Sequence, residues 1–356
     1  MTQSKRNYGI DLLRLVAMFM VVVLHVSGHG GILENVKKGG GYEAAWLVDL
    51  AAFCAVDCYA VISGYVSYPE QEKKYRYSRY LSIWIPAFIY GFGINVAGAF
   101  LLKNTISIKW LIKSAAIVTK DCYWYVTAYT GVFFMEPVLN KAVRAASERE
   151  LNTMMLMVLV VFCVYGNISG FQLNGGYSFV WLLILYLVGA WMKKNKIARK
   201  LSPLVWCVLL AGSVLFVWGW LNWGPFKQDH FVRYTSVFVV TAAVSLIAIF
   251  SEMKFRSEKI CKGIEFWAPA AFGVYLIHDH GFIREHYISN AFVWVAELPV
   301  WKIPLAVLGC AFCIFAVCLL IERVRLTLFD KLKLNYLIGT VQRWIDDRID
   351  ACAEKI

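Results

Sequence analysis

An arginine and two histidines interrupt the apolar stretch at residues 10–29, IDLLRLVAMFMVVVLHVSGH. Arg14 and His25 are eleven positions apart, so on a helix they share one face and lie about 16 Å apart along its axis. Asp11 and His29 extend this polar line by about one turn at each end. A fixed guanidinium suits a phosphate-bearing ligand, and an imidazole suits proton transfer. The spacing therefore indicates a site for both.

Each of these residues also has an ordinary structural interpretation. Arg14 can extend to the lipid headgroups, paired with Asp11, and His25 can hydrogen-bond a neighbouring helix. A charged side chain inside the bilayer costs about 2.5–3.5 kcal/mol or more unless it faces protein or water. The combination of Arg14 and His25 on one face favours a polar site inside the bundle.

The composition predicts an all-α integral membrane protein. Of 356 residues, 60% are hydrophobic and 17% are charged, whereas soluble domains are nearer half and a quarter. A spanning helix needs about 20 mostly apolar residues. The apolar runs predict a bundle of about ten transmembrane helices, at residues 10–29, 44–66, 80–102, 124–140, 151–167, 177–192, 202–221, 231–250, 268–284 and 303–322.

Lysine and arginine concentrate in the loops on one side of such a bundle, so both termini are predicted to be cytoplasmic. The exception is the basic stretch 103–120, in which ISIKWLIKSAAIV has the pattern of an interfacial helix. The net charge of +12 follows from these loops; we expect anionic lipid headgroups as partners and no nucleic acid. The expected organisation is one membrane domain, 1–330, and a short cytoplasmic tail, 331–356, predicted to be an amphipathic helix.

Six motifs, in order, make the chain resemble the acyltransferase-3 family of integral membrane acyltransferases. The resemblance covers about residues 8–330. Its motifs are R-x10-H at Arg14 and His25, VDCYAVISGYV at 56–66, RYSR at 76–79, YWYVTAYTGVFFMEPVLN at 123–140, FGVYLIHDH at 272–280 and IER at 321–323.

The resemblance implies transfer of an acyl group, usually acetyl, from acyl-CoA to a hydroxyl of a cell-envelope saccharide or glycolipid, in the bacterial inner or plasma membrane. Arg14 then lies near the CoA and His25 is the general base. No activated serine or cysteine nucleophile is evident, which favours direct transfer, although an acylated His25 stays open. Arg76 and Arg79 are candidate ligands of the CoA phosphates, or ordinary positive-inside charges. Acetyl-CoA is the expected donor, and no metal is expected.

Each remaining candidate has both a functional and a structural interpretation. Asp57, in the second predicted span, must be paired, protonated or facing water, and it is the candidate to orient His25. The candidates for substrate binding are Ser63, Trp124, Tyr129, His278 and Glu322, and each also has a structural interpretation. Ser63 can hydrogen-bond within its own helix, and Trp124 and Tyr129 can belong to an interfacial aromatic belt. His278 can be a structural histidine, and Glu322 can pair with an arginine. Gly64 is expected at a close helix contact.

Two other functions compete with an O-acyltransferase. The membrane half of the vancomycin-resistance serine racemases resembles the same family, which suggests a transporter or binding protein for serine or another small molecule; a racemase domain is absent from these residues. The second alternative to an O-acyltransferase is a non-catalytic partner in polysaccharide export. The presence of both Arg14 and His25 favours catalysis, because an assembly partner needs neither inside the bilayer.

Overall fold

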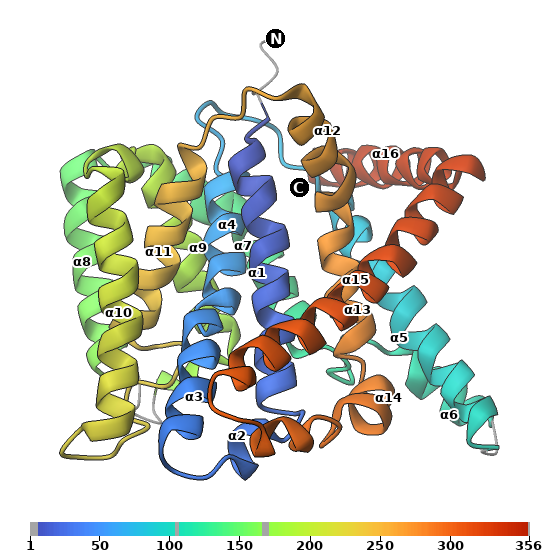
Figure 1. Ribbon diagram of the computed structural model, residues 1–356. Coiled ribbons are helices and arrows are strands. Elements are labelled where there is room, and N and C mark those ends of the chain that lie inside the picture. Colours follow the sequence, from blue (N-terminus) through green and yellow to red (C-terminus); the bar gives the residue numbers. More distant parts are fainter. Residues whose placement is uncertain (1–5, 104–106, 166–170, 355–356) are drawn as a thin grey trace.

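The computed structural model describes residues 6–103, 107–165 and 171–354, and across them the chain is helical, without strands (Figure 1). Helix α1 (Tyr8–Ser27) runs through the middle of the bundle. It packs against α3 (Gly40–Ala52), α4 (Ala55–Ser67), α11 (Val237–Ser251), α13 (Ala271–His278) and α15 (Lys302–Lys331). The all-α prediction is confirmed for the described residues.

Every predicted apolar run coincides with helix. The other five are α5 (Leu81–Leu101), α7 (Trp124–Ala145), α8 (Glu148–Val164), α9 (Phe179–Lys194) and α10 (Pro203–Trp223). Residues 166 and 167 of the fifth run, and residue 106 of the expected interfacial helix, lie outside the described residues; the rest of that stretch contains α6 (Ile108–Ala115).

Six stretches of the described chain are long and apolar enough to cross a membrane. They are Tyr8–Asn35, Gly40–Ser67, Tyr77–Leu101, Pro203–Trp223, Glu258–His278 and Lys302–Lys331. The chain is thus a multi-pass membrane protein, and the count of ten spans and the side of each terminus stay predictions.

Two predicted spans are interrupted by a break in the helix. The 44–66 run is two helices, because α3 ends at Ala52 and α4 begins at Ala55. The 268–284 run belongs to a longer stretch that begins with α12 (Glu258–Trp267) and ends with α13 at His278. A separate short helix, α14 (Gly281–Ile283), follows. The break between α13 and α14 matters for the site, because Asp279 lies in it.

Helices α4 and α9 meet backbone to backbone through two glycines. A Cβ added at Gly64 would lie 1.8 Å from the carbonyl oxygen of Tyr186, and one at Gly189 would lie 2.0 Å from that of Val61. Only glycine allows this approach, and small residues at such contacts are typical of membrane helices. The packing expected for Gly64 is therefore present.

The tail is helical and lies across one end of the bundle. Helix α16 (Leu334–Ala353), red in Figure 1, is at the same end as the start of α1 and is transverse to it. It is fixed there to the loop before α5: Asp346 accepts a hydrogen bond from the Ser78 hydroxyl at 2.8 Å, and Lys74 pairs with Asp350.

Candidate active site

Three hollows follow one face of α1. The basic hollow, about 630 Å³, lies at Arg14, and the aromatic hollow, about 220 Å³, lies at Met18, Val21 and His25. The polar hollow, about 580 Å³, lies at His25 and His29. The α1 residues among them, Arg14, Met18, Val21 and His25, fall at intervals of three or four, which is one helical face, and His29 follows in the turn after α1. The polar side chains that the sequence predicts on one face of this helix therefore line cavities.

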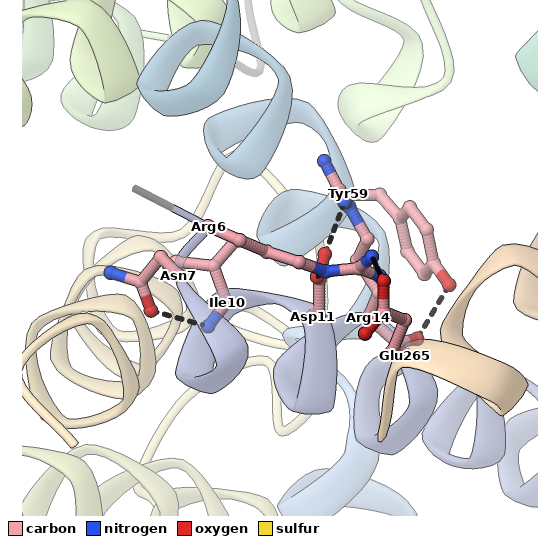
Figure 2. A network of polar contacts seen from close by, with 7 residues as sticks. All are labelled: Arg6, Asn7, Ile10, Asp11, Arg14, Tyr59 and Glu265. Atoms are coloured by element: carbon pink, nitrogen blue, oxygen red, sulfur yellow. Dashed lines mark hydrogen bonds and ion pairs between the residues drawn. The ribbon is translucent and has the colours of Figure 1, made fainter. Parts of the chain in front are cut away.

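A carboxylate bridge holds Arg14 at the basic hollow (Figure 2). Asp11 accepts from Nη1 of Arg14 at 2.7 Å and from Nε of Arg6 at 2.6 Å, and Arg6 also pairs with Glu265 of α12 at 2.9 Å. The side chain of Arg14 stays 33% exposed, so it is available to a ligand. The hollow is also lined by Asn7, Ile10, Tyr65, Val66, Glu70, Lys193 and Arg199. Its cations suit a phosphate group.

His25 is hydrogen-bonded to His278 from α13. Nδ1 of His25 lies 3.0 Å from Nε2 of His278, and Nδ1 of His278 lies 2.6 Å from the carbonyl oxygen of Val274. A carbonyl only accepts, so Nδ1 of His278 carries the proton. When both rings are neutral, Nε2 of His278 accepts from Nδ1–H of His25, and the lone pair of His25 is on Nε2. That nitrogen is the basic atom a general base requires.

The break after α13 and the segment that follows it add two charged groups that the sequence did not single out, Asp279 and Arg284. Asp279, 4% exposed, has Oδ1 3.6 Å from Nδ1 of His25 and 3.1 Å from Nη1 of Arg284. The ring of His29 lies 5.0 Å from that of His25. The signal for Asp279 was its place inside the HDH sequence at 278–280. These groups enclose the two imidazoles where the aromatic and polar hollows meet.

His25, His29 and Asp279 place ligand atoms within 4.8 Å of one another, a donor set able to hold a divalent cation. Two observations compete with that use. Asp279 is already paired with Arg284, and Nδ1 of His25 is hydrogen-bonded to His278. These contacts favour proton transfer, and the expectation that no metal binds stays a prediction.

Asp57, expected to orient His25, lies elsewhere in the core. It is fully buried, and its Oδ1 accepts from Nε1 of Trp181 at 3.2 Å. Its Oδ2 has no hydrogen-bond partner within the described part of the chain. The contact with His25 is made by His278 instead, from a helix 253 residues away. Sequence spacing does not reveal that pairing, because it depends on how α13 packs against α1.

Arg76 and Arg79 line a separate loop hollow of about 350 Å³, beside the end of α4. Arg79 donates to the buried carboxylate of Glu136 at 3.1 Å, and the hydroxyls of Tyr75 and Tyr129 donate to the same group at 3.1 Å each. Burial raises the pKa of the Tyr75 phenol, and so does the neighbouring carboxylate, which keeps it a donor. The structure therefore separates these arginines from Arg14.

A family model described as an acyltransferase domain matches residues 7–323. The chain belongs to the acyltransferase-3 family. No curated protein and no solved structure matches it. Acyl transfer is accordingly the general chemistry of the domain, and the match includes Arg14, His25, His278 and Asp279.

The other predicted substrate-binding residues of this acyltransferase-3 chain differ in position. Trp124 lines the aromatic hollow together with His25. Tyr129 is not among the lining residues of that hollow; its ring stacks on that of Tyr125, which does line it, with ring centres 6.1 Å apart. Ser63 donates to the carbonyl of Tyr59 on its own helix at 2.9 Å, which is the structural alternative.

Glu322 also has a structural set of partners. It is 2% exposed and accepts from the hydroxyl of Tyr90 at 2.7 Å, from Nε of Arg325 at 2.7 Å and from Nη2 of Arg325 at 2.6 Å. The carboxylate of a buried ion pair with this many bonds is fixed in place. Its geometry favours holding α15 against α5 over contact with substrate.

Proposed function

We propose that the protein transfers an acyl group, with acetyl as the expected case, from cytoplasmic acyl-CoA to a hydroxyl of an envelope saccharide or glycolipid, with His25 as general base. The observation that carries the proposal is the succession of hollows along α1, from Arg14 to His25 to His29. A membrane-spanning enzyme whose two substrates come from opposite sides needs a base where the two approaches meet.

The donor is assigned to the Arg14 end. The CoA phosphates bind the cations of the basic hollow, and the pantetheine arm follows α1 past Met18 and Tyr59 toward His25, a distance of about 16 Å along the helix. The thioester then lies in the aromatic hollow, whose apolar walls exclude water from it. Arg76 and Arg79 in the loop hollow are the second candidate for the phosphates.

The acceptor hydroxyl approaches from the polar hollow. Nε2 of His25 takes its proton as the hydroxyl oxygen attacks the thioester carbonyl carbon. The carbon–sulfur bond breaks, and the imidazolium returns the proton to the departing thiolate. His278 holds the ring of His25 in the tautomer that leaves Nε2 basic, and Asp279 stabilises the imidazolium that forms.

Two phenols supply donors for the thioester oxygen. The hydroxyls of Tyr125 and Tyr275 belong to residues of the aromatic hollow and are buried without a well-formed hydrogen bond among the described residues; their polar neighbours are the Ser63 hydroxyl and the backbone of Tyr125. Buried donors are normally paired. An oxyanion that develops during acyl transfer is a suitable partner, and each such donor typically contributes about 10²–10³ in rate.

The test is acetyl transfer by the full chain in liposomes, with radiolabelled acetyl-CoA and an envelope polysaccharide fraction. The His25→Ala variant should bind acetyl-CoA as the parent does and lose about 10²-fold or more in transfer. His230→Ala, at an exposed position outside the three hollows, is the matched control. Full transfer by His25→Ala would refute the mechanism, and serine uptake without transfer would favour the transporter alternative.

A further inference from the structure

We propose that the polar hollow is the acceptor subsite and that Asp49 makes it selective for uncharged or amine-bearing sugars over sugar acids. This inference rests on the proposed function for its role in transfer, but sugar binding is measurable without a donor. The hollow lies at the α2 (Ile32–Asn35) end of the bundle, opposite the start of α1.

The polar hollow is continuous with the catalytic histidines. Four of its residues, His25, His29, Tyr177 and Tyr234, also line the aromatic hollow. Its volume of about 580 Å³ is within the range of small-molecule sites. A sugar bound here therefore has a hydroxyl within reach of the base, whereas the basic hollow lies at the other end of the same helix face.

A buried carboxylate and an unpaired donor lie side by side on one wall. Asp49 of α3 is 4% exposed and has the Ser27 hydroxyl as a polar neighbour. Trp46, one turn earlier on α3, has a buried Nε1 without a hydrogen-bond partner in the ranges that the structure describes. Buried polar groups of both kinds need partners. A polyol offers them, because each hydroxyl both donates and accepts.

The charges on the walls predict which sugars are accepted. The hollow is lined by two carboxylates, those of Glu34 and Asp49, and by no lysine or arginine among the described residues. A sugar acid would place its own negative charge beside these two acidic side chains, which costs free energy in a partly enclosed site. The remaining walls include the rings of Trp46, Phe53 and Tyr177, which suit the apolar face of a pyranose.

Binding is tested on the full chain in lipid nanodiscs by saturation-transfer NMR, without acyl-CoA. The probes are methyl glucopyranoside, glucosamine and the methyl glycoside of glucuronic acid. The parent protein should bind the first two more tightly than the third. Asp49→Asn should weaken glucosamine and methyl glucopyranoside by about tenfold or more and should narrow the gap to the glucuronoside, which a merely structural change would not do.

Three comparisons decide the result. Acetyl-CoA binding should be retained by Asp49→Asn, and Asp229→Asn, in a loop outside the polar hollow, should behave as the parent. Trp46→Phe removes one N–H and keeps a ring, so it should weaken all three sugars to a similar degree. A parent protein that binds none of the probes, or an Asp49→Asn protein with unchanged selectivity, would overturn the inference and leave the acetyl-transfer test unaffected.

Discussion

Nδ1 of His25 lies 3.0 Å from Nε2 of His278, although the two residues are 253 positions apart. The contact joins α1 to α13 at the level where the aromatic and polar hollows meet. Since Val274 fixes the proton of His278 on Nδ1, the neutral pair has only one tautomer that satisfies both hydrogen bonds. The position of the basic nitrogen is therefore set by the backbone of α13.

Replacing His278 should reduce the rate of transfer more than the binding of donor. His278→Ala removes the acceptor for Nδ1–H of His25, so kcat should fall about 10–100-fold while the Kd for acetyl-CoA stays within about twofold. His278→Gln, whose amide oxygen accepts the same bond, should recover part of the activity. Steady-state kinetics with the exposed His286→Ala as control will check this. Equal loss in the Ala and Gln variants would argue against the orienting role.

Replacing Arg14 should weaken CoA binding through a phosphate. Arg14→Ala should raise the Kd for acetyl-CoA about tenfold or more, because a hydrogen bond between charged groups contributes about 1.5–3 kcal/mol. Titration calorimetry with acetyl-CoA and with its 3′-dephospho form identifies the group: if the 3′-phosphate is the partner, the variant and the parent should bind the dephospho form alike. Arg348→Ala, on α16, is the control. Unchanged affinity in Arg14→Ala would remove its assigned role.

The pair of Arg79 and Glu136 should behave as a structural unit. Glu136 is 1% exposed whereas the side chain of Arg79 is half exposed, and removing the carboxylate would leave the hydroxyls of Tyr75 and Tyr129 without their acceptor. Glu136→Ala should therefore lower the thermal midpoint of the protein in detergent. Arg79→Ala should do so less, because Tyr75 and Tyr129 still donate to the carboxylate. The double variant should lose less than the sum of the two, and strict additivity would contradict the coupling.

Enlarging Gly64 should destabilise the bundle without affecting a ligand directly. The added Cβ of Gly64→Ala would meet the carbonyl oxygen of Tyr186 at 1.8 Å, so α4 and α9 must separate. The expected result is a lower thermal midpoint by scanning fluorimetry. Gly212→Ala on α10 has no atom within 4 Å of the added carbon and should leave the midpoint unchanged. A stable Gly64→Ala protein would show that the helix contact is looser than described.

Much of the fold could be predicted from hydropathy, because each apolar run is about as long as a helix. The boundaries that failed, at 44–66 and 268–284, are places where the helix breaks inside an apolar stretch. At 44–66 hydropathy does not register the break, since the turn residues Phe53 and Cys54 are themselves apolar. At 268–284 the break falls at Asp279 and His280, two polar residues inside a run that is otherwise mostly apolar. Those breaks shape the site, as Phe53 lines the polar hollow.

The α1 half of the site followed from periodicity, and the rest did not. Arg14 and His25 lie on α1, so their common face is fixed by 3.6 residues per turn, and His29 follows in the turn directly after that helix. The partners His278, Asp279 and Arg284 come from α13 and the segment after it, and their approach depends on tertiary packing. A carboxylate inside a span requires an explanation, which made Asp57 the candidate to orient His25; the indole of Trp181 bonds one of its two oxygens instead.

The glycine contact between α4 and α9 has a consequence for how substrates enter. With carbonyl groups pressed against the facing backbone at Gly64 and at Gly189, neither helix can slide along the other without a collision of main-chain atoms. The two helices must travel as one rigid body. Any movement that admits a bulky acceptor to the polar hollow therefore falls to the segments that line it, such as α2 and the turn at Ser289 and Asn290.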